Sequence, residues 1–360
     1  MSTTEATTRP RRPRDPYLDN ARGLLIALVV VGHTIECFEN TADVLGGTLY
    51  TAIYSFHMAA FIMISGYLSR SYRNEPRQVR RLLTAMVVPY VIFQMVHETG
   101  KALLLGSEFE LQLLLPAWTL WFLVALLGWR LLTPVLRQLK HPLMFAVAIS
   151  VIAPLDPDLG SVLSVGRLAE MLPFFVLGLI ATPEMLERVK AFRHRWLGGA
   201  VLLAAVAVAY LVDDRVPTSI FYLRSGYEDD RGLLLSMLLQ VMVLLAGVAG
   251  SLAILLVTPR GRSPLTAMGE RSLTIYLLHP VLLLPIRYAE ELPEWLVSWW
   301  GTLGMVAAAL LLTAILSTTV VGRVTSWLTD PPIGDLLVRS QDDGPREPRP
   351  TAANGIPPRT

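Results

Sequence analysis

The chain has 360 residues, of which 53% are hydrophobic and only 17% are charged, and its mean hydropathy is +0.49. These values exclude an ordinary soluble domain and indicate an all-α, polytopic integral membrane protein. The single cysteine, Cys37, excludes an intramolecular disulfide, and the formal net charge of +2 gives no reason to expect a nucleic-acid partner.

The two ends of the chain differ from the middle in composition. Residues 1–16 are rich in Thr and Arg, and the end of the chain carries Pro, Asp and Arg without apolar periodicity. We expect a disordered basic tail over residues 1–16, a membrane-embedded domain over 17–325 and a mostly disordered tail over 326–360. Because the chain continues only briefly beyond its last apolar run, we expect no appended domain.

Between the tails, apolar runs recur that are long enough to cross, or nearly cross, a bilayer. They lie at residues 22–39, 49–68, 82–105, 113–133, 142–155, 168–182, 197–212, 232–257, 272–289 and 297–321. The first run contains polar His33 and Glu36 and no small-residue cleavage pattern follows it, so it is a retained helix rather than a cleaved signal peptide. The pattern predicts about ten transmembrane helices.

Lys and Arg alternate with acidic residues in the connecting segments. The basic groups are Arg9, Arg11, Arg12 and Arg14; Arg70, Arg73, Arg77, Arg80 and Arg81; Arg137 and Lys140; Arg188, Lys190, Arg193 and Arg195; and Arg260, Arg262 and Arg271. The positive-inside rule places these segments, and both termini, in the cytoplasm. A bias toward Arg, Ala, Leu and Val is typical of a high-GC bacterium, so we expect a multi-pass protein of the bacterial inner (plasma) membrane.

Arg22 and His33 interrupt the first run. Their separation of eleven positions is roughly three helical turns, so both side chains fall on one face, about 16 Å apart in depth. We expect Arg22 near the interface and His33 near mid-membrane. Glu36 follows His33 at the i, i+3 spacing that lets a carboxylate orient an imidazole, which is the minimal general base. The alternative is a histidine that only fixes helix packing.

Two further histidines fall inside apolar runs. His57 is expected near the middle of the second helix and His279 within the ninth, and either a functional or a packing role is open for them. His97 and Glu98 lie in the outer half of the third run, where nearness to the interface makes a polar side chain inexpensive. The spacing of Cys and His fits no metal site, so no catalytic metal is expected.

The segment from Ser69 to Arg81 is expected to be a loop that carries five arginines and leads into the third helix. Its end, with Arg77, Arg80 and Arg81, has two interpretations that do not exclude each other. Such clusters determine topology and contact anionic lipid. Guanidinium groups also bind phosphate bidentately, and Arg22 would lie at the same face of the membrane.

The motif Tyr17-Leu-Asp-Asn-Ala-Arg22-Gly23, followed by His33, resembles the opening of the membrane-bound acyltransferase 3 family, in which ten residues separate an arginine from a histidine. Further segments are similar to the branch of fucose-4-O-acetylase-like O-acyltransferases. They are Ser55-Phe-His-Met58, Ser65-Gly-Tyr67, Arg77-x-x-Arg80 with Pro89-Tyr90, Leu120-Trp-Phe-Leu123, Leu172-Pro-Phe-Phe-Val-Leu-Gly178 and Ser272-Leu-Thr-Ile-Tyr-Leu-Leu-His279-Pro280. The resemblance runs from about Tyr17 to Gly322.

The resemblance implies an acyl-CoA donor, most simply acetyl-CoA, and O-acetylation of a carbohydrate or another extracytoplasmic or lipid-linked acceptor of the cell envelope. Arg22, Arg77, Arg80 and Arg81 would then hold the phosphates of the donor. His33, assisted by Glu36, would deprotonate the acceptor hydroxyl or carry the acyl group itself. His57 or His279 would polarise the thioester carbonyl or complete a proton relay. Transfer would go directly to the acceptor or to a separate partner protein.

A proton-coupled transporter or flippase is the competing interpretation, because buried His and Glu residues also carry protons and arginines bind anionic substrates. The absence of a visible duplicated half disfavours it, since many transporters contain internal repeats. A non-catalytic scaffold would leave the spacing of Arg22 and His33 unexplained. The sequence specifies no oligomeric state.

Overall fold

The computed structural model describes residues 15–38, 43–156, 159, 162–212, 218–223, 226–227, 232–289, 293–296 and 298–329. These residues form helices and connecting segments, with no strand among them. Six helical segments are long and apolar enough to cross a membrane, or up to eight if each bent helix pair is one span. The prediction of an all-helical membrane protein is therefore confirmed.

Each predicted apolar run contains a helix. The six long segments are α1 (Pro16–Glu36); α2 (Val44–Tyr54) with α3 (His57–Leu68); α4 (Pro76–Leu82) with the π-helix η1 (Leu83–Val87) and α5 (Val88–Leu105); η2 (Trp118–Leu120) with α6 (Trp121–Leu136); α12 (Leu233–Val257); and α15 (Trp299–Leu316). Two pairs are bent, by 58° between α8 (Val165–Glu170) and α9 (Leu172–Ile180) and by 89° between α10 (Pro183–Ala191) and α11 (Trp196–Val212).

The remaining described helices are shorter. They are α7 (Pro142–Ile152) with η3 (Ala153–Leu155), η5 (Val162–Ser164) before α8, η6 (Thr218–Tyr222), α13 (Pro264–Glu270), α14 (Ser272–Arg287), η8 (Glu294–Leu296) and α16 (Thr319–Thr329). Of these, α14 and the segment from α7 to η3 are apolar but shorter than a full span. Both α14 and α13 lie against α1.

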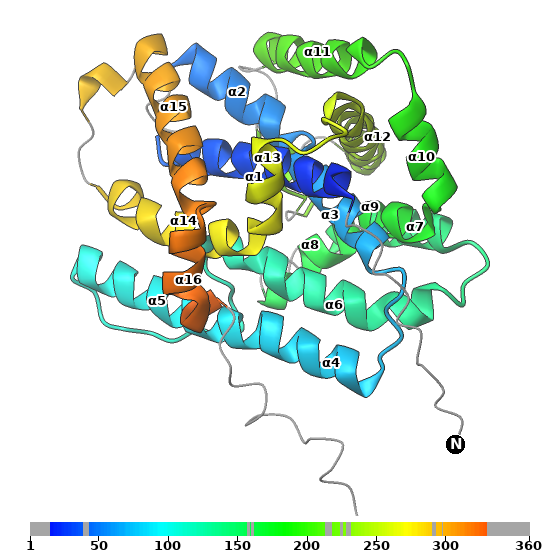
Figure 1. Cartoon of the computed structure of the whole chain (residues 1–360), viewed down its shortest axis with the longest axis horizontal. Helices are drawn as coiled ribbons and strands as arrows, with labels where there is room; N and C mark the ends of the chain where they lie inside the picture. Colours follow the sequence, from blue (N-terminus) through cyan, green and yellow to red (C-terminus); the bar gives the residue numbers. More distant parts are fainter. Residues whose placement is uncertain are drawn as a thin grey trace, which may run out of the picture.

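Helix α1 crosses the middle of the bundle (Figure 1), where it contacts α2, α3, α13, α14 and α15. Its contact with α13 is the closest. A Cβ atom on Gly23 would lie 2.0 Å from the carbonyl oxygen of Leu265, and one on Gly269 would lie 1.7 Å from that of Asp19. Real Cβ atoms do not approach an oxygen so closely, so glycine is required at both positions. The glycine after Arg22 therefore has a packing role.

Asn20 ties α1 to the segment between α12 and α13. Its Nδ2 donates to the carbonyl oxygens of Pro259 (2.8 Å) and Gly261 (2.6 Å). Its Oδ1 accepts from Ser263 Oγ (2.9 Å) and Thr266 Oγ1 (2.6 Å). All the hydrogen-bonding capacity of this fully buried amide is thereby used, which is what burial of a polar group requires.

Three sequence-based positions need correction. Helix α1 begins at Pro16, after the N-cap Asp15, and ends at Glu36, so His33 lies in its last turn and not at its middle. The second run is broken at Ser55 and Phe56, which makes His57 the first residue of α3 rather than the middle of a continuous helix.

The arginine-rich segment is the third correction, because only its first part is a loop. Helix α4 begins at Pro76, and a capping box formed by Glu75 and Gln78 starts it there. The arginines at 77, 80 and 81 are therefore helical. The π-helical turn that follows precedes Pro89, whose ring cannot donate the usual backbone hydrogen bond.

Candidate active site

His33 and Glu36 contact each other as their spacing predicts. His33 Nδ1 lies 2.7 Å from Glu36 Oε2. Because an ionised carboxylate only accepts hydrogen bonds, Nδ1 carries the proton of a neutral imidazole and the lone pair lies on Nε2. With this tautomer Nε2 is the basic atom of His33, an arrangement that suits a general base.

Three more side chains hold the Glu36 carboxylate, and each comes from a different element. The Tyr54 hydroxyl, at the end of α2, donates to Oε2 (2.9 Å). Trp118 Nε1, at the start of η2, donates to both oxygens (3.1 and 3.2 Å). Arg287 Nη1, at the end of α14, donates to Oε1 at 3.2 Å, and its guanidinium lies 4.3 Å from the centre of the Trp118 ring. Glu36 is therefore held in one orientation as a carboxylate.

Tyr54, Trp118 and Arg287 were missed by the sequence analysis. The signal for Arg287 was present, because an arginine near the end of the apolar run 272–289 is itself unusual in a membrane segment. Tyr54 and Trp118 gave no such signal, since aromatic residues are common in these runs.

The backbone at Trp118 has a φ of +38°, in the left-handed region that non-glycine residues rarely adopt. Such a conformation costs on the order of 1–3 kcal/mol and persists only where the surroundings impose it. The indole N–H bonded to Glu36, with Arg287 stacked on the ring, is the contact that accompanies it here. The strain is thus located at the site.

His279 and His57 lie next to this group. The His279 ring stacks on His33 with centroids 5.5 Å apart, and the His57 ring is 4.8 Å from that of Tyr54. In each, Nδ1 is 2.8 Å from the carbonyl oxygen four residues earlier, Ile275 or Ile53, so Nδ1 donates and Nε2 keeps the lone pair. Both rings are buried, and Nε2 of His279 has no hydrogen-bond partner among the described residues. The three histidines singled out from the sequence are thus close together.

His97, which the sequence places in the outer half of its apolar run, has a buried side chain in α5. Its Nε2 has no hydrogen-bond partner in the part of the chain that the structure describes. Glu98 beside it accepts a hydrogen bond from Gln94 Nε2 at 3.2 Å. The interior of the bundle therefore contains a fourth imidazole.

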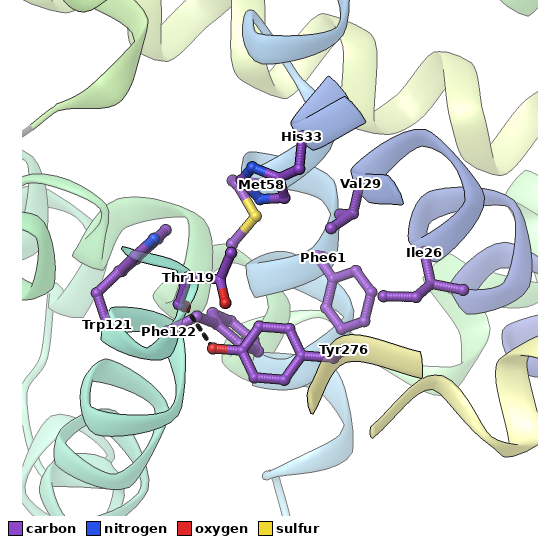
Figure 2. A pocket seen from close by; sticks show the side chains of 9 residues that line it. All are labelled: Ile26, Val29, His33, Met58, Phe61, Thr119, Trp121, Phe122 and Tyr276. Carbon is purple, nitrogen blue, oxygen red and sulfur yellow. Dashed lines mark hydrogen bonds between the residues drawn. The ribbon is translucent and has the colours of Figure 1, made fainter. Parts of the chain in front are cut away.

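A small apolar pocket with a cavity volume of about 20 Å³ adjoins His33 (Figure 2). Ile26 and Val29 line it together with His33, at the spacing of one face of α1. The opposite walls are Met58 and Phe61 of α3, Thr119, Trp121 and Phe122 of η2 and α6, and Tyr276 of α14. Arg22 lies one turn before Ile26, so the pocket follows α1 from His33 toward the Arg22 end.

The arginines expected to bind phosphate lie on two elements. Arg22 forms an ion pair with Asp19, while its Nε is buried and has no hydrogen-bond partner within the described ranges. On α4, Arg77 and Arg81 are exposed and Arg80 is half-buried. Whether these four bind one ligand stays a prediction.

Within the described ranges, no group of three or more His, Cys, Asp or Glu side chains is placed to hold a metal ion. The prediction of no catalytic metal also stays a prediction, because it concerns the chemistry of the whole chain.

A helical membrane bundle with a hydrogen-bonded His–Glu pair beside an apolar pocket is an arrangement that suits general-base chemistry. The model of the acyltransferase 3 family, which is described as an acyltransferase domain, matches residues 15–318. The chain belongs to this family, which confirms the resemblance of its motifs and favours a transferase over a transporter or flippase.

Two curated relatives give more distant similarity. Nodulation protein NolL of Mesorhizobium japonicum is 28% identical over 218 residues, which cover 55% of this chain and 56% of the relative. Nodulation protein NolL of Sinorhizobium fredii is 29% identical over 216 residues, again covering 55% and 56%. The chain thus spans about half the length of the curated relatives it matches. No solved structure is significantly similar to it.

Proposed function

We propose that this protein transfers an acyl group, most simply acetyl, from cytoplasmic acyl-CoA to a hydroxyl of a carbohydrate or another extracytoplasmic or lipid-linked acceptor. The observation that carries the proposal is the position of His33. Its Nδ1 is held by Glu36, and its ring closes one end of an apolar pocket that follows α1. A base beside such a pocket suits a thioester carried on a flexible arm.

The donor would lie along α1. Its pantetheine arm would lie along α1 past Ile26 and Val29 and widen the small pocket there, with the thioester at His33. The rise of an α-helix separates Arg22 from His33 by about 16 Å, so the phosphates would lie at the Arg22 end. Arg22 would bind them with N–H groups that Asp19 does not use, and Arg77, Arg80 and Arg81 of α4 would bind the rest.

The chemical step follows from the tautomer of His33. Nε2 takes the proton of the acceptor hydroxyl as the oxygen attacks the thioester carbonyl. The C–S bond then breaks, and the leaving thiolate receives the proton from the imidazolium. Glu36, paired with Arg287, stabilises the imidazolium in between. In the alternative route Nε2 attacks the thioester carbonyl and the C–S bond breaks, releasing the CoA thiolate. The acyl group then passes from the ring to the hydroxyl oxygen, and the hydroxyl proton ends on the thiolate.

His57 and His279 fit one of their two expected roles better than the other. When neutral, each has a lone pair on Nε2, so it accepts a proton and cannot donate one to the thioester carbonyl. A proton relay is therefore the better role. His279, stacked on His33, is the nearer partner.

For the whole chain we propose ten membrane spans and cytoplasmic termini, with the basic tail at 1–16, the membrane domain at 17–325 and a second tail at 326–360. The two bent pairs and the two shorter apolar segments, added to the six long segments, support that number. The arginine-rich segments support the orientation. A bacterial plasma membrane is the proposed location, with the His33 end of α1 toward the outer side.

The test uses the purified full chain in lipid bilayers with acetyl-CoA, and it measures CoA release and acetyl transfer. His33→Ala and Arg22→Ala are expected to abolish both signals while thermal unfolding stays as in the native protein. A His33→Ala protein that still acetylates at the native rate would refute the mechanism. Failure of the native protein to bind acetyl-CoA would refute the donor.

A further inference from the structure

Thr119 lines the same pocket as His33 (Figure 2), and its hydroxyl group has no role in the mechanism described so far. The side chain is 2% exposed, and its Oγ1 has no hydrogen-bond partner among the described residues. Leaving a buried hydroxyl without a partner is costly, so folded proteins seldom contain one without a reason. The pocket beside it indicates that the partner is a ligand.

Two other fully buried threonines show the usual arrangement. The hydroxyl of Thr133 donates to the carbonyl oxygen of Trp129 at 3.0 Å, and that of Thr313 donates to the carbonyl oxygen of Ala309 at 2.8 Å. Both lie inside long helices, where the carbonyl four residues earlier is within reach. Thr119 lies in the single turn η2, at the start of its helical segment, so the preceding residues offer no such helical carbonyl. Its proton is therefore available to a ligand.

The turn that carries Thr119 is fixed by two other helices. The hydroxyl of Tyr276, from α14, donates to the carbonyl oxygen of Thr119 (Figure 2). Gln94, fully buried in α5, accepts a hydrogen bond from the backbone N–H of Ala117 at 2.9 Å. The strained backbone of Trp118 lies between these two contacts. Thr119 is thus in position before a ligand binds, which is the condition for strong electrostatic stabilisation of a transition state.

The proposed reaction needs a donor at this pocket. Attack on a thioester places negative charge on its carbonyl oxygen, and a hydrogen-bond donor that faces this oxygen lowers the barrier. Neutral His57 and His279 present a lone pair at Nε2 instead of a donor. Tyr276 provides the other hydroxyl of the pocket wall, and it already donates to Thr119. The cavity volume of about 20 Å³ accommodates one group the size of a water molecule, such as a carbonyl oxygen.

We infer that Thr119 is a further catalytic residue, whose hydroxyl donates a hydrogen bond to the carbonyl oxygen of the thioester. As the acceptor oxygen bonds to the carbonyl carbon, the π electron pair moves to the carbonyl oxygen and the acceptor proton moves to His33 Nε2. The C=O bond then reforms, the C–S bond breaks with its electron pair on sulfur, and the thiolate takes the proton from the imidazolium. Thr119 keeps its own proton throughout.

The same hydrogen bond serves the alternative route, because attack by His33 Nε2 also places charge on the carbonyl oxygen. The inference rests on the proposed acyl transfer. It adds to that site the group that stabilises the developing oxyanion, a role for which the sequence had suggested His57 or His279.

The test uses the full chain in lipid bilayers as native protein, Thr119→Val, Thr119→Ser and the control Thr133→Val. Valine has the shape of threonine without the hydroxyl, whereas serine keeps the hydroxyl. Thr133 is a matched control because it is fully buried in the helix that follows η2 and its hydroxyl has a partner in the fold. The measurements are kcat and KM for CoA release from acetyl-CoA with water as the acceptor, Tm, and the infrared frequency of the bound, carbon-13-labelled thioester carbonyl.

We expect kcat to fall by about a hundredfold or more in Thr119→Val, the usual effect of removing one such donor, with KM for acetyl-CoA within about threefold of native. Tm should not fall, because the lost hydroxyl has no partner among the described residues. The carbonyl frequency should be higher than in the native protein. Thr119→Ser should keep about a tenth or more of native kcat. Thr133→Val should show the opposite pattern, a lower Tm with native kcat.

Three results would overturn the inference. The first is a Thr119→Val protein that keeps more than about a tenth of native kcat. The second is a parallel loss of kcat and Tm in that variant that serine does not restore, which would mean a packing role. The third is a carbonyl frequency in the native complex equal to that of acetyl-CoA in an apolar solvent, and this measurement stands even if Thr119→Val does not fold. All three would leave the proposed function intact, whereas a native protein that does not bind acetyl-CoA would refute the proposed function and the inference with it.

Discussion

Glu36→Gln keeps the shape of the side chain but removes its charge and half of its accepting capacity. In the native protein every neighbour donates to the carboxylate: His33 Nδ1, Tyr54, Trp118 and Arg287. An amide has one accepting oxygen, so its NH₂ group must face at least one of these donors. The substitution therefore disturbs the orientation of His33 as well as its electrostatic stabilisation.

The size of the effect follows from the charge that His33 acquires in the proposed mechanism. With His33 Nδ1 at 2.7 Å from Glu36 Oε2, the centres of the two charged groups are roughly 4 Å apart, which corresponds to about 4 kcal/mol at an effective dielectric constant of 20. Since each 1.36 kcal/mol is tenfold in rate, kcat should fall by about a thousandfold.

The assay is CoA release at saturating acetyl-CoA and acceptor, with thermal unfolding as the control for folding. Glu36→Asp serves as a second variant, because it keeps the charge and shortens the side chain, and it should lose less than Glu36→Gln. A Glu36→Gln protein that retains more than about a tenth of native kcat, while His33→Ala is inactive, would refute a role for Glu36 in stabilising the imidazolium.

Three further variants test the packing and the pocket. Gly269→Ala places a Cβ 1.7 Å from the carbonyl oxygen of Asp19 and should prevent folding or lower Tm strongly, whereas Gly304→Ala, with open space around it, should not; equal Tm values would disprove the tight contact. Asn20→Ala leaves four hydrogen-bonding groups without this partner and should lower the free energy of unfolding by denaturant by about 2–4 kcal/mol; an unchanged free energy would show that these hydrogen bonds do not stabilise the fold. Val29→Trp fills the pocket and should weaken acetyl-CoA binding in calorimetry, and unchanged affinity would place the donor elsewhere.

The helices were predictable because hydropathy reports directly on the cost of placing a segment in lipid. Each apolar run contains a helix, and the His33–Glu36 contact followed from local helical geometry. The start of α1 was placed six residues too late, at residue 22 instead of Pro16. The reason is that Asp19 and Asn20 lower the hydropathy, although hydrogen bonds to the segment after α12 satisfy Asn20.

The side chains that surround Glu36 could not be predicted from local sequence patterns. Tyr54, Trp118 and Arg287 belong to three helical segments, and only packing of those segments around α1 brings them to one carboxylate. The break after α2 and the positive φ of Trp118 shape this convergence, and neither has a signature in single-sequence periodicity. Contacts between residues that are far apart in the sequence cannot be predicted from the faces of single helices.

Helix α1 is one uninterrupted helix of 21 residues that is immobilised at both ends. Near its start, the hydrogen bonds of Asn20 and the close glycine contacts with α13 fix its position. At its end, four side chains form hydrogen bonds with Glu36. The interval between the guanidinium of Arg22 and the imidazole of His33 is therefore a fixed length. A donor must match that length to contact Arg22 and His33 at the same time. We therefore expect the protein to distinguish full-length CoA thioesters from truncated ones by their length.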